Sequence, residues 1–98
     1  MKREIEPQLK GKEAEELYRV LAKISNKDEM ADFLRDLMTI EEIEEIVRRF
    51  EVAKLLSKGL TSREIAKKTK MSSATISRIN YWLHHGTGGY DLALGKLK

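Results

Sequence analysis

The sequence contains no cysteine, and this absence excludes disulfide bonds and thiolate metal sites. It also lacks any apolar run near the roughly 20 residues that a membrane-spanning helix needs. The first residues, MKREIEPQLKGKE, have no apolar signal-peptide core. We therefore expect a cytoplasmic protein that does not associate with a membrane. With 98 residues the chain can form one small domain, whose core is marginal unless a partner adds buried area.

Side chains that carry out chemistry are also scarce. His84 and His85 are the only histidines, and adjacent helical residues point about 100° apart, which is poor geometry for sharing a metal ion. The GTGG segment lacks the lysine and the strand–loop–helix context of a phosphate-binding loop. The acidic run over residues 41–45 falls where a helix dipole favours negative charge. We predict no metal site, no cofactor and no enzymatic activity.

Positive charge is concentrated in the second half of the chain. Residues 1–60 hold 12 Lys and Arg against 14 Asp and Glu, a net charge of −2. Residues 61–98 hold 7 against 2, a net charge of +5. A field of this sign over one segment suits binding to phosphates, although a lysine-rich helix can also be a solvated surface.

The segment with this charge, TSREIAKKTKMSSATISRINYWL at 61–83, has the pattern of a helix-turn-helix. Thr61 and Glu64 form a capping box that predicts a helix start. Ser72 or Ser73 can cap a second helix, whose apolar face recurs at helical spacing in Ile76, Ile79 and Leu83. Its other face carries short side chains suited to base edges and phosphates. Lys70 departs from the pattern, because this tight turn usually carries glycine.

The first sixty residues predict three more helices, over 13–24, 26–38 and 39–57, with Gly59 as the stop signal after the third. The third is expected to turn Ile43, Ile46, Val47, Phe50 and Ala53 inward. Their apolar faces are broad for a small chain, which favours a dimer with interlocking N-terminal helices over an ordinary monomer core. We expect a flexible arm over 1–12, dimerisation helices over 13–58, a helix-turn-helix over 59–85 and a Gly-rich tail over 86–98.

Taken together, LMTIEEI, RRFEVAKLLSKG, SREIAKKTKMSSATISR and the tail GTGGYDLAL resemble the Trp repressor superfamily, in particular its Trp-repressor-related YerC/YecD branch. The resemblance implies an all-α, Trp-repressor-like multi-helix domain with a C-terminal helix-turn-helix, assembled as an intertwined homodimer. It also implies binding to double-stranded DNA at palindromic operators with half-sites one helical turn apart.

The positions that match the family's DNA contacts, together with the basic and polar groups beside them, form the candidate DNA-binding set. It comprises Ser62, Arg63, Lys67, Lys68, Lys70, Ser72, Ser73, Ala74, Thr75, Ser77 and Arg78. Arg78 can contact a phosphate or pair internally with a glutamate. By the same resemblance, Arg48 and Arg78 match the two arginines that enclose tryptophan in Trp repressor. The residue after the second arginine is glycine there and Ile79 here, so tryptophan is not the expected corepressor and any other small-molecule effector is unknown.

Two function classes follow from these residues. The first is a sequence-specific, homodimeric transcriptional regulator. The second is a helix-turn-helix module that docks on a protein of the transcription or replication machinery. A docking helix needs large apolar anchors on its exposed face, whereas residues 72–78 offer small polar groups and a cation, which favours DNA.

Overall fold

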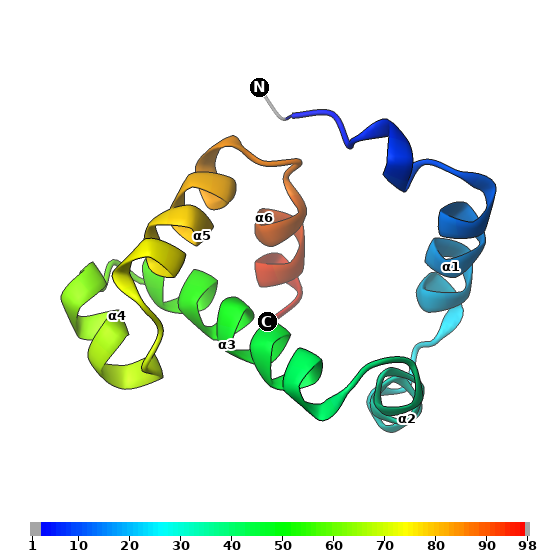
Figure 1. Ribbon diagram of the computed structural model, residues 1–98, viewed down its shortest axis with the longest axis horizontal. Coiled ribbons are helices and arrows are strands. Elements are labelled where there is room, and N and C mark those ends of the chain that lie inside the picture. Colours follow the sequence, from blue (N-terminus) through cyan, green and yellow to red (C-terminus); the bar gives the residue numbers. More distant parts are fainter. Residues whose placement is uncertain (1–2, 98) are drawn as a thin grey trace. The chain divides into compact units, whose positions relative to one another are not determined.

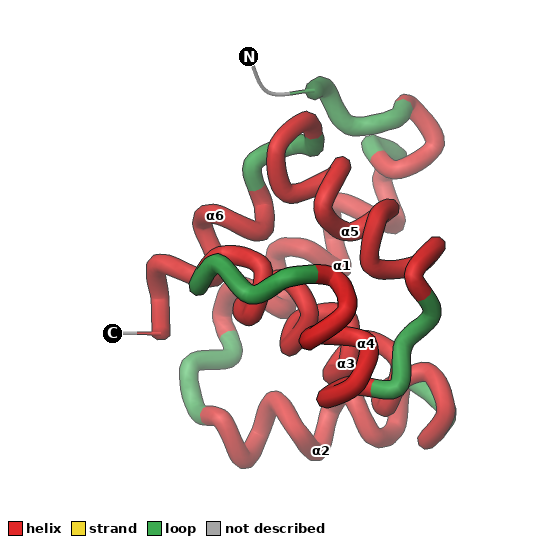
Figure 2. The backbone as a smooth tube through the Cα atoms, turned by 90° about the vertical axis from the view of Figure 1, so that its left-hand side faces the viewer, coloured by secondary structure: helices red, strands yellow, loops and turns green. Residues whose placement is uncertain are grey.

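The computed structural model describes residues 3–97, and every regular element within that range is helical (Figures 1 and 2). The elements are η1 (Pro7–Leu9), α1 (Lys12–Lys23), α2 (Lys27–Leu37), α3 (Ile40–Ser57), α4 (Ser62–Thr69), α5 (Ser73–His85), α6 (Gly89–Leu94) and η2 (Gly95–Leu97). The all-α fold class predicted from the sequence is confirmed. Met1 and Lys2 of the predicted arm and Lys98 of the predicted tail lie outside the described residues. None of the described helices is long and apolar enough to cross a membrane.

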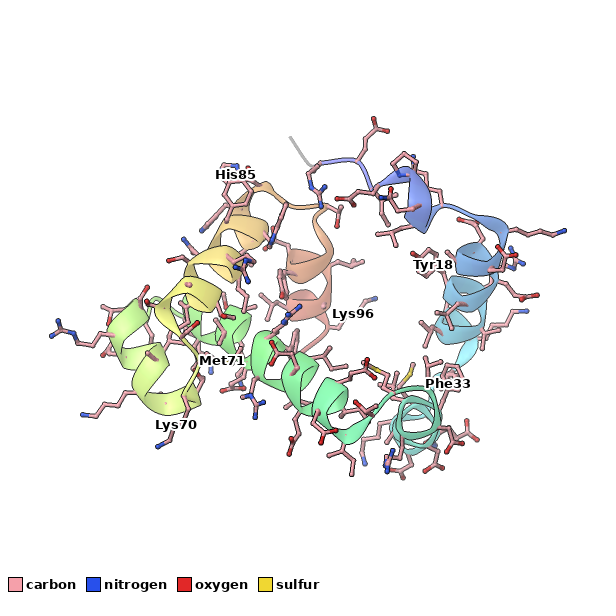
Figure 3. The ribbon with its side chains drawn as sticks, viewed as in Figure 1. Tyr18, Phe33, Lys70, Met71, His85 and Lys96 are labelled. Carbon is pink, nitrogen blue, oxygen red and sulfur yellow. The ribbon has the colours of Figure 1, made fainter. Side chains whose placement is uncertain are left out.

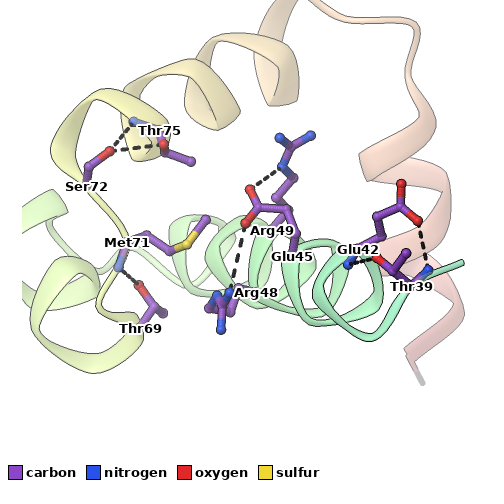
Figure 4. Close-up of polar contacts among 9 residues, drawn as sticks. All are labelled: Thr39, Glu42, Glu45, Arg48, Arg49, Thr69, Met71, Ser72 and Thr75. Atoms are coloured by element: carbon purple, nitrogen blue, oxygen red, sulfur yellow. Dashed lines mark hydrogen bonds and ion pairs between the residues drawn. The ribbon is translucent and has the colours of Figure 1, made fainter.

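Side-chain caps fix where two of the N-terminal helices begin. At α2 the Asn26 side chain accepts the backbone N–H groups of Asp28 and Glu29 at 2.8 and 3.1 Å. At α3 the Thr39 hydroxyl accepts the Glu42 N–H at 3.1 Å while the Glu42 carboxylate accepts the Thr39 N–H at 2.8 Å (Figure 4). Each cap satisfies amides that the first helical turn leaves unpaired, so these starts were readable from local sequence.

The chain divides into two units, one of which comprises residues 4–43. This unit contains η1, α1, α2 and the first turn of α3, and η1, α1 and α2 bury no residue. Tyr18 donates a hydrogen bond from its hydroxyl to the Leu9 carbonyl at 2.9 Å. Leu37 and Ile40 are 51% and 53% exposed. The apolar faces predicted for this part of the chain are therefore present but only partly covered, because their other residues are at most half-buried.

The other unit comprises residues 44–97 with Arg3, and we call residues 44–97 the head. Its core joins α3, α4 and α5, and it contains every buried apolar residue that the structure describes: Val52, Ala53, Leu55, Ile65, Ile76 and Ile79. Met71 and Tyr90 are among the half-buried side chains packed against this core. Within the head, α5 packs against both α4 and α6 (Figure 1). Gly59, with φ of 91°, ends α3 in a conformation that favours glycine.

Two features of the head differ from expectation. Ile46 and Val47, expected to point inward with Phe50 and Ala53, are 39% and 60% exposed, because the head core begins further along α3 at Val52. Within the Gly-rich tail, for which no helix is predicted, residues Gly89–Leu94 form the short helix α6. Gly86 ends α5 there, and a Cβ atom at Gly86 would lie 2.4 Å from the Trp82 carbonyl oxygen.

Candidate nucleic-acid interface

The first helix of the motif, α4, begins at the predicted capping box. The Thr61 hydroxyl accepts the Glu64 N–H at 3.2 Å, and the Glu64 carboxylate accepts the Thr61 N–H at 2.8 Å. The Thr61 backbone N–H, followed by the Thr61 hydroxyl and more weakly by Lys68, lowers the pKa of Glu64. The cap fixes the first turn, which presents Ser62 and Arg63 as exposed side chains.

A Thr69 hydroxyl supports the turn that leads from α4 to α5. It donates to the Ile65 carbonyl at 2.8 Å and accepts the Met71 N–H at 3.3 Å (Figure 4). Lys70, between these two residues, has φ of 63° and ψ of 17°, which is the left-handed conformation. The departure from glycine noted in the sequence is therefore accommodated without changing the left-handed geometry of the turn.

The second helix of the motif, α5, is capped by Ser72, which settles the choice left open between Ser72 and Ser73. The Ser72 hydroxyl oxygen accepts the Thr75 N–H at 3.1 Å, and the two hydroxyl groups lie 3.0 Å apart in a hydrogen bond (Figure 4). Ile76 and Ile79, at 0% and 4% exposure, bury one side of α5 in the head core.

The outer side of α5 is polar and built from short side chains, with one longer cation at its far end. Thr75 is half-buried, and the exposed residues of this surface are Ser72, Ser73, Ala74, Ser77 and Arg78. No acidic side chain among residues 3–97 lies within salt-bridge distance of Arg78, so the internal pair considered for it is not formed there. The guanidinium is consequently available to an external anion.

Three lysines extend this surface along α4 and its turn. Lys67, Lys68 and Lys70 are all exposed. Together with Arg63 and Arg78 they give the motif its positive charge, while the Glu64 carboxylate is engaged in the cap. Small polar groups on one helix beside cations on the other are suited to base edges and to phosphates respectively.

Arg48, the other candidate effector residue, lies on α3. Its guanidinium is 4.0 Å from the Glu45 carboxylate, which also accepts a 3.0 Å hydrogen bond from Arg49 (Figure 4). These side chains are 40–51% exposed, so the pairs contribute little to stability.

The far end of α5 holds a group of side chains that the sequence pattern did not reveal. The Arg3 guanidinium lies 4.5 Å from the centroid of the Trp82 ring, and the Arg3 N–H donates to the Gly86 carbonyl at 2.8 Å. A hollow of about 530 Å³ adjoins them and is lined by Phe50, Trp82, Thr87 and Tyr90 among others. Burial raises the pKa of Tyr90, against a smaller lowering by Arg49. Neither Arg48 nor Arg78 lines this hollow.

Comparison with known proteins agrees with this architecture. Residues 12–98 match the Trp repressor protein family. The chain is 38% identical over 90 residues to the uncharacterised protein YerC of Bacillus subtilis. This alignment covers 92% of this chain and 86% of YerC. It superposes with a TM-score of 0.88 on the crystal structure of a TrpR-like protein from Eubacterium eligens, at 41% identity and with 94% and 95% of the two chains covered. A candidate Trp repressor from Staphylococcus aureus gives a TM-score of 0.85 at 32% identity, with 92% and 90% covered.

The match to the family extends over both units of the chain, the identity to its relatives exceeds 30%, and the motif that the family uses on DNA is formed here by α4 and α5. The chain belongs to the Trp repressor family, a family of DNA-binding regulators rather than enzymes.

Proposed function

We propose that the protein is a cytoplasmic, sequence-specific transcriptional regulator that binds palindromic operators in double-stranded DNA as a homodimer, without tryptophan as its corepressor. The observation that carries this proposal is the division of α5 into two sides. Ile76 and Ile79 anchor the helix in the head core, while short polar side chains cover the opposite side. Because its buried side is anchored in the core, α5 can present its outer side to a major groove without losing its own packing.

The residues divide by the type of contact that their chemistry permits. Arg63 can form a bidentate pair with a guanine or a phosphate. Ala74 and the Thr75 methyl group suit contact with a thymine methyl group. Ser72 and Ser77 suit phosphates, which position the protein without specifying a sequence. With few bidentate readers on the helix, DNA shape and bridging water are expected to supply a share of the specificity.

A homodimer is supported by the uncovered apolar surface outside the head core. Neither α1 nor α2 buries a residue, and Leu37, Ile40 and Val47 are between 51% and 60% exposed. Interfaces of obligate homodimers are the more hydrophobic kind and exceed about 2,000 Å² in total. A second copy of the chain provides the same apolar faces by symmetry, and it would place two recognition helices about a two-fold axis.

The proposal that tryptophan is not the corepressor rests on Ile79. This side chain is 4% exposed and belongs to the head core, so it occupies space beside Arg78 that a glycine would leave open. Calorimetry with millimolar tryptophan tests the point directly. A binding heat accompanied by tighter operator binding would contradict it.

The first experiment is selection from a random duplex library at physiological salt, followed by sequencing of the bound fragments. The expected result is an enriched palindrome with half-sites roughly 34–36 Å apart. Ala74→Glu should abolish enrichment, because it sets a carboxylate on the exposed side of α5. Gly95→Glu is the matched control, since it adds the same charge at a position where a Cβ atom meets no neighbour. Absence of any enriched sequence would overturn the proposal, and a partner protein would then be sought for the helix-turn-helix.

A further inference from the structure

Lys70 adopts a backbone conformation that its side chain disfavours. Its φ of 63° is the only positive value among the non-glycine residues that the structure describes. An L-residue with a Cβ atom is strained in the left-handed region, and the position after a helix is one that glycine usually fills for this reason. The chain therefore keeps a lysine where glycine would give a more stable turn.

The surroundings of Lys70 hold it in this conformation. The Lys70 N–H donates to the Ala66 carbonyl at 2.9 Å, which closes the last turn of α4. On one side the Thr69 hydroxyl joins the Ile65 carbonyl to the Met71 N–H, at 2.8 and 3.3 Å. On the other side the half-buried Met71 packs against the head core. A strained residue persists when its neighbours determine its backbone in this way.

The ammonium group of Lys70 does nothing to offset the strain within the chain. The side chain is exposed and makes no hydrogen bond or ion pair with any residue in 3–97. Lys67 and Lys68, three and two residues earlier, are also cations and so cannot pair with the Lys70 ammonium. Figure 3 shows Lys70 at the outer side of the turn, whereas Met71 lies on the side facing α3. Neither packing nor charge pairing in the folded chain accounts for a lysine here.

A strained residue without an internal role points to a ligand outside the chain. The positive charge of the group selects an anion. Lys70 lies two residues before Ser72, the residue that caps α5, so its ammonium is carried by the same turn that begins the exposed polar side of that helix. A DNA phosphate next to the groove that α5 enters would lie at this end of the motif.

We propose that Lys70 binds a DNA phosphate and that the chain accepts a less stable turn in order to place it there. This inference rests on the proposed function. It also distinguishes Lys70 from Lys67 and Lys68, because only Lys70 has the strained backbone that lowers the stability of the fold. Removing the side chain should then have two opposite effects, a more stable fold and weaker binding to DNA.

The test compares Lys70→Gly, Lys70→Asn and Lys70→Arg with the unmodified protein, at one chain concentration, on a selected operator and on unrelated duplex DNA. Lys70→Gly should raise Tm by about 4–8 °C. Lys70→Gly and Lys70→Asn should both weaken binding about fivefold on both DNAs, and flatten the plot of log affinity against log salt by about 0.9 per subunit. Lys70→Arg, which keeps the charge, should retain affinity and slope. Lys96→Ala is the control, because it removes an equal charge from η2, which follows α6 and lies outside the helix-turn-helix (Figure 3).

The outcomes separate this inference from the proposed function. If the unmodified protein shows no salt-dependent DNA binding, the proposed function is overturned and this inference with it. If the unmodified protein binds but Lys70→Gly and Lys70→Asn keep its affinity and slope, only the phosphate contact is overturned. A Lys70→Gly variant that is no more stable than the unmodified protein would overturn the strain. An equal loss of affinity in Lys96→Ala would overturn the assignment to Lys70, because net charge alone would then explain the effect.

Discussion

Thr61 and Glu64 hold each other's backbone amides, at 3.2 Å from the Glu64 N–H to the Thr61 hydroxyl and at 2.8 Å from the Thr61 N–H to the Glu64 carboxylate. This reciprocal pair sets the first turn of α4, which carries the exposed Arg63. The Glu64 carboxylate is thus engaged inside the motif, since it accepts the N–H of the N-cap residue Thr61 at the start of the helix that carries the lysines.

Glu64 should make stability depend on pH. Its pKa is lowered in the folded chain from the ordinary value of 4.5, chiefly by the Thr61 N–H. Because the pKa is lowered on folding, the contribution of Glu64 to the free energy of unfolding is fully present above its pKa in the unfolded chain. That contribution is lost as the pH falls through its pKa in the folded chain. We expect Glu64→Gln, which keeps the cap geometry, to lose less stability than the unmodified protein as the pH falls from about 5 to about 3, the range set by the pKa of an unfolded glutamate. Urea unfolding across this range measures the difference, and parallel pH profiles would contradict it.

The head core should depend strongly on Ile76. This side chain is fully buried and lies on α5 opposite the proposed DNA-reading surface. Ile76→Ala should destabilise the fold by about 2–5 kcal/mol, since it removes three buried carbon atoms and leaves a cavity. Ser77→Ala, at the next and exposed position, should change stability by less than about 0.5 kcal/mol. Urea unfolding of both variants checks the contrast, and equal effects would mean that α5 is not anchored through Ile76.

Local chemistry explains why much of the motif could be predicted from the sequence. The caps at Thr39, Thr61 and Ser72 depend on residues three positions apart, and all three are formed. Helical spacing likewise placed Ile76 and Ile79 on the buried side of α5.

What could not be predicted depends on contacts between distant residues. Helix α6 has only six residues, and its Tyr90 packs on a core assembled from three other helices. The contact of Arg3 with Trp82 joins residues 79 positions apart along the chain, which no local pattern encodes. The exposure of Val47 was missed for a related reason, because periodicity shows that a face is apolar but not which molecule covers it.

Val47 should therefore be needed for self-association. It is 60% exposed in the single chain, so a charged residue there costs the isolated chain little. In a homodimer that covers this face, Val47→Asp would bury an unpaired carboxylate and should shift the protein to monomers. Val47→Ala keeps the face apolar and should remain dimeric. Sedimentation equilibrium at matched concentrations distinguishes them, and an unchanged mass for Val47→Asp would show that Val47 lies outside the interface.

Lys67 and Lys68 should contribute affinity without specificity. Both are exposed on α4 beside the capped turn. If each contacts a phosphate, changing either to alanine should lower affinity for all duplexes alike and reduce the salt slope by about 0.9 per subunit. Fluorescence anisotropy across a salt series on operator and unrelated DNA tests this. A loss confined to the operator would instead make the residue a base reader.

Arg63 is expected to act differently from these lysines, because its planar guanidinium can form a bidentate pair with a guanine. It is exposed in the first turn of α4 and follows the cap by two residues, so removing its side chain should leave the fold and self-association intact. We expect Arg63→Ala to weaken operator binding by about 1–3 kcal/mol if it reads a base, and to weaken binding to unrelated DNA far less.

Arg63→Lys keeps the charge but not the bidentate geometry, so it should restore binding to unrelated DNA and not operator selectivity. Anisotropy on both DNAs, with sedimentation as the check on assembly, decides the role. Equal losses on the two DNAs, with recovery in Arg63→Lys, would assign Arg63 to a phosphate, and an unchanged operator affinity would remove it from the interface.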